Sequence, residues 1–247
     1  MESKIASLLK LRSHPVAVYR TTQCPENAMQ FQEGKWGCVV SMLHASATKG
    51  ITAAFSDKTV VCKGGRAGTG IEPFQTGVIE YFLSVGGKGP KKGEFYKRSP
   101  ALALDYMNAM PEYRTDHYLV LTPLCNVEAE PKEPLDGVIF LVNADQLSGL
   151  VTLSNFDSER SDNTAVTFGA GCAQSILFPF SAENTNQKCY IGLTDPSARK
   201  YIRGDLLSFS IPWARFQKME AMAEESFLTK ETWNAIADRL EGPASSR

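Results

Sequence analysis

Six cysteines are the residues of this sequence best suited to chemistry, and four of them follow a repeated pattern. The motif Gly-Cys-x-x-Ser-x-Leu occurs at residues 37–43 and again at 171–177. Each copy is followed, after a polar turn and a strand-like run, by another cysteine with a glycine three residues later. The four cysteines are Cys38, Cys62, Cys172 and Cys189. Thiolates bind zinc and iron–sulfur clusters, so the repeat indicates a metal or cluster site.

Helix starts are expected at two of these cysteines. The run from 36 to 48 contains no helix breaker and is followed by Lys49-Gly50, a cationic last turn with a glycine C-cap. We therefore predict a buried helix with Cys38 in its first turn. The second copy of the motif predicts a corresponding helix that begins near Cys172. Unsatisfied amides at a helix start favour the thiolate over the thiol.

The other two cysteines are expected in strands. Residues 51–55 and 59–62 flank a short polar turn, which is the pattern of a hairpin whose second strand ends at Cys62. A strand that carries Cys189 is predicted over residues 188–193. Pseudo-twofold packing of two similar halves would bring the four sulfurs together. They would then hold structural zinc or an iron–sulfur cluster with a redox or cofactor-handling role.

Two other interpretations of the cysteines stay open. The sequence lacks the short C-x-x-C pairs of zinc ribbons, and free cysteine also behaves as a small buried hydrophobe. Alternatively, Cys38 or Cys172 is a reactive or redox thiol at a helix start. Cys24 and Cys125 have no counterpart in the repeat. These patterns do not decide whether the protein is an enzyme.

A glycine-rich segment after Cys62 provides a second kind of candidate site. Residues 64–70 are predicted to form a flexible loop whose amides, together with an arginine, hold an anion. The spacing fits neither the dinucleotide fingerprint nor the P-loop. The candidate residues of such a binding module for a small anionic molecule are Gly64, Gly65, Arg66, Gly68 and Arg199. In that interpretation the cysteines are core packing.

The composition limits the classes of partner. With 26 basic and 27 acidic residues among 247, the chain has no broad basic surface for nucleic acid or anionic lipid. The N-terminal segment turns polar within a dozen residues, and no run approaches the roughly 20 apolar residues of a membrane span. We therefore expect a cytoplasmic protein with reduced thiols and no nucleic-acid or membrane partner. A small-molecule ligand or a redox partner is expected instead.

The order of predicted elements indicates an α+β fold with mixed or antiparallel sheets and packed helices. A single domain is expected over residues 1–240, built from two pseudo-symmetric halves at about 1–127 and 135–240. Residues 241–247 are predicted to fray, and the glycine- and lysine-rich stretch 86–92 is predicted to be a surface loop. The apolar C-terminal helix predicts either a homodimer contact or packing within one subunit.

A family resemblance follows from the placement of short motifs along the chain. The motifs are Pro15-Val16-Ala17-Val18, the helix of Cys38, Cys62 before its glycine segment, Cys172, and Ile211-Pro212 at the close of the domain. In this layout the chain resembles the family called domain of unknown function 169, over roughly residues 5–240. The resemblance implies a single-domain α+β protein of prokaryotes in which Cys38, Cys62 and Cys172 occupy typical cysteine positions. It implies no particular reaction or substrate.

Overall fold

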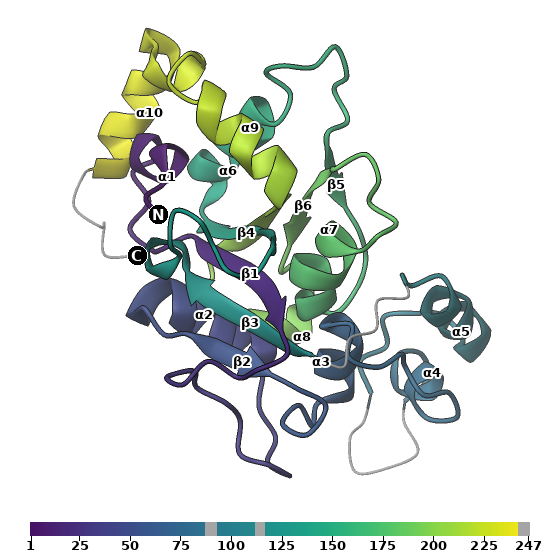
Figure 1. Ribbon diagram of the computed structural model, residues 1–247. Helices are drawn as coiled ribbons and strands as arrows, with labels where there is room; N and C mark the ends of the chain where they lie inside the picture. Colours follow the sequence, from purple (N-terminus) through teal and green to yellow (C-terminus); the bar gives the residue numbers. More distant parts are fainter. Residues whose placement is uncertain (87–92, 112–116, 242–247) are drawn as a thin grey trace.

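A seven-stranded mixed sheet forms the centre of the protein (Figure 1). The computed structural model describes residues 1–86, 93–111 and 117–241. The strands lie in the order β2-β3-β1-β4-β7-β6-β5. Their bounds are Val16–Thr21 (β1), Ala53–Phe55 (β2), Tyr118–Pro123 (β3), Leu135–Val142 (β4), Thr164–Val166 (β5), Cys189–Gly192 (β6) and Leu207–Pro212 (β7). The pair of β5 and β6 is parallel, whereas each of the other neighbouring pairs is antiparallel.

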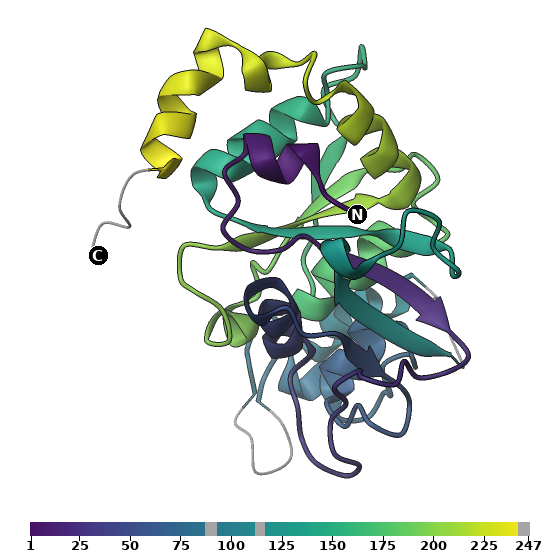
Figure 2. The same cartoon turned by 60° about the vertical axis from the view of Figure 1, so that its left-hand side comes forward.

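Helices cover both faces of this sheet, as Figures 1 and 2 show from two directions. The α-helices are Lys4–Leu8 (α1), Val39–Lys49 (α2), Lys63–Gly68 (α3), Ile79–Phe82 (α4), Pro100–Asn108 (α5), Ala144–Leu153 (α6), Phe178–Phe180 (α7), Pro196–Arg199 (α8), Trp213–Met222 (α9) and Glu231–Glu241 (α10). Leu124–Asn126 (η1) and Phe227–Thr229 (η3) are 3-10 turns, and Ala173–Leu177 (η2) is a π-helical segment. The combination of sheet and helices confirms the predicted α+β class.

Side chains that alternate between the two faces of the central strands form two separate hydrophobic cores. In β4, Ile139 and Leu141 belong to the core that contains the buried face of α2. Val138 and Phe140 belong to the opposite core, which α1, α6, α9 and α10 cover. Successive side chains of a strand point to opposite faces of the sheet. The two cores therefore lie on either side of the sheet, and a strand residue can contribute to only one of them.

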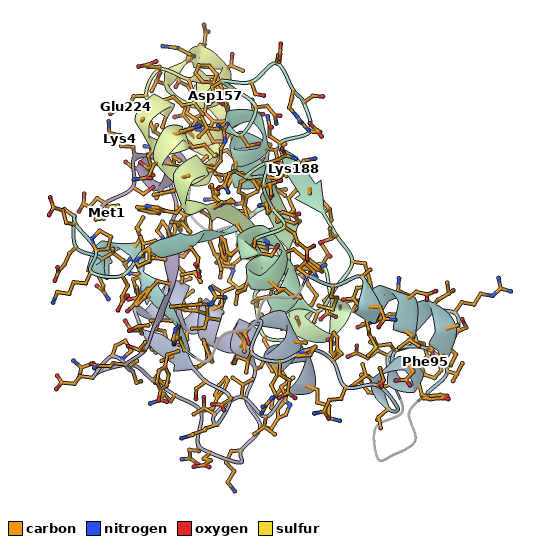
Figure 3. All side chains as sticks on the ribbon, turned by 45° about the vertical axis from the view of Figure 1, so that its right-hand side comes forward. Met1, Lys4, Phe95, Asp157, Lys188 and Glu224 are labelled. Carbon is orange, nitrogen blue, oxygen red and sulfur yellow. The ribbon has the colours of Figure 1, made fainter. Side chains whose placement is uncertain are left out.

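A small helical lobe, made of α4 and α5, stands beside the sheet (Figure 1). Its buried side chains form a separate cluster that consists of Ile79, Leu83, Ala103 and Met107. Ser99 begins α5, because its side chain accepts a hydrogen bond from the amide of Leu102. Figure 3 shows Phe95 on this lobe, in the segment between the two helices.

The region after β2 differs from the sequence prediction. We expected a second hairpin strand at 59–62 and a flexible loop at 64–70, but residues 63–68 form α3 instead. Close packing explains the helix, because a Cβ at Gly65 would lie 3.1 Å from the Val60 side chain. Farther along, the helix within residues 74–85 is limited to the single turn of α4.

The two halves of the chain occupy adjacent parts of one sheet. Residues 1–127 supply β1, β2 and β3, and residues 135–240 supply the other four strands. Their internal similarity stays a prediction, because the named strands of the first half pair in antiparallel fashion while the second half includes the parallel pair of β5 and β6. α10 ends at Glu241, so the predicted fraying of 242–247 lies outside the described residues. The same holds for residues 87–92 of the predicted surface loop.

Candidate functional site

Three of the predicted cysteines line one cavity, with a volume of about 700 Å³. They are Cys38, Cys62 and Cys172, and each is a free thiol. Their places in the sequence are far apart, so the fold and not local spacing brings them to the same wall. The cavity lies between α2, α3, the start of the helical segment 171–180 and the lobe of α4 and α5.

Each of the three cysteines stands where a helical segment begins. Cys38 is the N-cap residue of α2, and Cys62 is the N-cap residue of α3. Cys172 lies in the first turn of the segment 171–180 and directly precedes η2. The predicted helix at Cys38 is confirmed, including its C-cap, since Gly50 has a φ of 70°. π-helical segments are rare and frequently occur at functional sites, so η2 draws further attention to Cys172.

Glycines let these helix starts approach one another. A Cβ at Gly68 of α3 would collide with the Cys172 sulfur and would lie 2.7 Å from the Ala173 backbone nitrogen. The thiol of Cys172 donates a hydrogen bond to the Gly64 carbonyl, with a distance of 3.1 Å between sulfur and oxygen. A Cβ at Gly171 would lie 3.4 Å from the Val40 side chain of α2. α2, α3 and η2 are thus fixed together around the thiols.

Asp195, the N-cap residue of α8, holds the start of the Cys172 segment in place. Its buried carboxylate accepts a hydrogen bond from the Gly171 amide at 3.0 Å. It also accepts from the amide and hydroxyl of Ser197 and from the Tyr96 hydroxyl, which belongs to the lobe segment. One side chain therefore ties together the thiol site, α8 and the lobe.

We expect Asp195→Ala to lower the free energy of unfolding by about 1–3 kcal/mol, because buried amides would lose their acceptor. Asp195→Asn should cost less, since it keeps one acceptor oxygen. Urea denaturation followed by circular dichroism measures both changes. Asp205→Ala is the matched control: this carboxylate pairs with Arg203 at the surface, and its loss should cost less than about 1 kcal/mol. Equal losses in Asp195→Ala and Asp205→Ala would contradict the proposed role of Asp195.

Burial dominates the protonation of Cys38 and Cys172. It raises the pKa of Cys38, although hydrogen bonds from the Ser41 and Val40 amides act in the opposite direction. Burial also raises the pKa of Cys172, and the proximity of Cys62 and Cys38 raises it further. The helix-start amides thus act on Cys38 as expected, but they do not overcome desolvation. Both thiols are protonated at neutral pH, which argues against the reactive-thiol interpretation.

We expect iodoacetamide at pH 7 to modify Cys125 first and Cys172 last. Cys125 is exposed, whereas Cys172 is buried and its raised pKa leaves little thiolate. The labelling rate of Cys38 should rise about tenfold per pH unit, because the reactive thiolate fraction grows at that rate below the pKa. Peptide mass spectrometry after timed quenching measures the order. Labelling of Cys172 ahead of Cys125 at pH 7 would restore the reactive-thiol interpretation.

The structure does not bring Cys189 to the other three cysteines. Cys189 begins β6 and is fully buried in the core of α6 and α9, whereas Cys172 belongs to the core on the opposite face. The sheet therefore lies between the two sulfurs. Burial raises the pKa of Cys189 to about 12, with Arg215 acting in the opposite direction. Cys62 and Cys189 are also in different elements, a helix start and a strand start.

The predicted anion-binding residues are distributed differently from the expectation. Gly64 and Gly65 line the cavity, and Gly68 packs against Cys172. The guanidinium of Arg66 pairs with Glu72 at 2.6 Å and donates to the carbonyls of Asp57 and Val60. That of Arg199 donates to the carbonyls of Leu193, Gly204 and Leu206. Neither arginine is among the described residues that line the cavity.

Comparison with known families identifies one family to which most of the chain is similar. Residues 4–222 match the family model described as uncharacterised ArCR, domain of unknown function 169. The chain belongs to this family. No curated protein and no solved structure shows a significant match to the chain.

In this member of the domain of unknown function 169 family, the cavity has an aromatic wall that sequence reasoning missed. It is formed by Trp36, Phe74, Phe82, Tyr96, Tyr106, Phe168 and Tyr201. These residues come from separate loops and helices and share no periodicity. Only their assembly in the fold reveals the wall.

Two further observations limit the chemistry of the site in this family member. Within residues 1–86, 93–111 and 117–241, no group of three or more His, Cys, Asp and Glu side chains is placed to hold a metal ion. The three thiols thus face one cavity without forming a closed site for a single ion. No helix in the described part of the chain is long and apolar enough to cross a membrane.

Proposed function

We propose that this protein binds an iron–sulfur cluster through Cys38, Cys62 and Cys172 and serves a redox or cofactor-handling role. The observation that carries the proposal is the convergence of three free thiols, from three separate helix starts, on one cavity of about 700 Å³. Cysteine thiolates are the usual ligands of such clusters. Cys189, on the other side of the sheet, is not part of this proposal.

The spacing of the thiols favours a cluster over a single zinc ion. Zinc requires three or four ligand atoms at about 2.0–2.3 Å from one point, and the described residues provide no such group. In a cluster, different iron atoms take different thiolates, so the ligands need not meet at a point. Three cysteines would leave one coordination position without a protein thiolate.

The surroundings of the thiols suit a cluster that is protected from water. Val39, Val40 and Ala170 line the same cavity, and Val39 and Val40 are buried. The reduction potential of a cluster depends on burial and on hydrogen bonds to sulfur, so the apolar wall would influence that potential. Because burial raises the pKa of Cys38 and Cys172, cluster binding must release protons. Retention of the cluster is therefore expected to weaken as the pH falls.

Iron and acid-labile sulfide analysis of protein purified without oxygen tests the proposal, together with an absorption spectrum. We expect iron and sulfide in comparable amounts and a broad visible band. The same assays after reconstitution with ferrous iron and sulfide control for loss of the cluster during purification. A folded protein that stays colourless and free of iron after reconstitution would contradict the proposal. Zinc without sulfide would point to a structural metal instead.

A further inference from the structure

We infer that the cavity also binds a small, planar organic anion whose apolar body lies against the aromatic wall. The inference goes beyond the proposed cluster and does not require it, since the groups that would bind the ligand are aromatic and lysine side chains and not the three cysteines. A volume of about 700 Å³ is within the usual range of small-molecule sites.

The aromatic residues form two groups at the cavity. Phe168 contacts Tyr106 and Tyr96, with ring centroids 4.9 Å and 6.0 Å apart. Trp36 and Tyr201 form the second group, with centroids 5.9 Å apart. Phe168 and Trp36 remain 42% and 53% exposed, although both are large and apolar. Rings that line a cavity and stay accessible offer flat surfaces for stacking with a planar ligand.

Polar groups of the wall are already occupied within the protein. The Asp195 carboxylate accepts from Gly171, Ser197 and Tyr96. The Tyr96 hydroxyl in turn accepts a hydrogen bond from the Ser197 amide at 3.1 Å. A ligand rich in hydrogen-bonding groups would find few partners in this part of the wall. An apolar body, in contrast, gains from burial against the rings without disturbing these bonds.

Positive charge at the wall indicates that the ligand carries an anionic group. Lys63 and Lys200 line the cavity, and both are exposed. The ammonium group of Lys97 lies 4.4 Å from the ring centroid of Phe168 and adds a third cation beside the aromatic wall. Glu94 and Asp195 carry opposing charges at the same wall, but the Asp195 carboxylate already accepts from Gly171, Ser197 and Tyr96, so the lysines are the groups that would pair with an anionic ligand. An anion near the lysines, with its rings on Phe168, satisfies both features.

A pair of fluorescent probes tests both parts of the inference. 8-Anilinonaphthalene-1-sulfonate carries a planar naphthalene ring system and an anionic sulfonate, and N-phenyl-1-naphthylamine has the same aromatic body without the charge. We expect saturable binding of both at one site per chain, with the anion bound more tightly. Phe168→Ala should weaken both probes about tenfold, because a stacking surface is lost. Phe156→Ala is the matched control, since Phe156 is 47% exposed and does not line the cavity.

The lysines are tested in the same titrations. The double variant Lys63→Gln, Lys200→Gln should bind the sulfonate probe about threefold to tenfold more weakly, while its affinity for the neutral probe should change less than about twofold. Added salt should reduce the difference between the variant and the unaltered protein for the sulfonate probe. Lys230→Gln, remote from the cavity and exposed, should change neither probe. Circular dichroism verifies that each variant is folded. An unchanged affinity of the Lys63→Gln, Lys200→Gln variant for the sulfonate probe would overturn the anionic part of the inference.

Measuring iron in each preparation separates this inference from the cluster proposal. Probe binding that persists in iron-free Cys38→Ser protein supports the cavity inference on its own. Iron retained without saturable probe binding would overturn the cavity inference and leave the cluster proposal standing. Equal weakening by Phe168→Ala and Phe156→Ala would show that the probes bind the surface, and this too would overturn it.

Discussion

Cys172→Ser is expected to reduce the iron and sulfide content at least tenfold relative to the unaltered protein. Serine is nearly the same size as cysteine, and its hydroxyl can donate to the Gly64 carbonyl as the thiol does. The fold should therefore persist while the soft sulfur ligand is lost. Cys38→Ser and Cys62→Ser are expected to have the same effect, because each removes one of only three ligands. Iron, sulfide and visible absorption after parallel anaerobic purification measure the loss.

Three other cysteines serve as controls in that series. Cys189→Ala removes a buried sulfur on the opposite side of the sheet and should cost about 1 kcal/mol of stability without loss of iron. Cys24→Ser and Cys125→Ser should keep both stability and iron, since neither residue lines the cavity. Equal iron in all six variants would contradict a thiolate-bound cluster. Loss of iron in Cys189→Ala alone would instead indicate that Cys189 binds the iron.

Local sequence patterns predicted the elements around Cys38 but not the partners of that residue. Cys38 stands at the start of α2 as its N-cap residue, directly before the first turn in which it was expected. The helix ends at Lys49 before Gly50, whose positive φ is the usual C-cap geometry. Cys189 was expected beside the other cysteines, yet the pleat of β6 directs it to the other core. A shift of one residue in a strand moves a side chain to the opposite face. A single sequence does not fix that choice here, so sequence patterns alone could not separate Cys189 from the other three cysteines.

Tertiary packing explains why α3 was missed. Gly64, Gly65 and Gly68 are poor helix formers, and their local preference is for a loop. In the fold, the missing side chain of Gly68 lets α3 pack directly against Cys172 and the start of η2, and that of Gly65 allows close contact with Val60. The helix propensities of the individual residues do not include the free energy gained from this contact. The aromatic wall could not be predicted from the sequence for the same reason, because its residues are brought together only by contacts between distant segments.

Gly68→Ala is expected to destabilise the protein and to impair cluster binding together. The added Cβ would collide with the Cys172 sulfur and would approach the Ala173 backbone nitrogen to 2.7 Å. A backbone atom cannot rotate away, so α3 and η2 must separate and carry Cys172 with them. Overpacking of this kind costs about 1–3 kcal/mol, which exceeds the gain of about 1 kcal/mol from alanine in a helix. We therefore expect a net loss of stability and a several-fold lower iron content.

Gly204→Ala is the matched control for this substitution, because a Cβ at Gly204 would meet nothing within 4 Å. It should leave both stability and iron content unchanged. Urea denaturation of the iron-free proteins separates the packing cost from any stabilisation by the cluster, since a bound group stabilises the folded state by mass action. If Gly68→Ala were as stable as Gly204→Ala and held as much iron, the contact between α3 and η2 would not position Cys172. The cavity thiols would then owe their placement to Asp195 and the Gly171 amide instead.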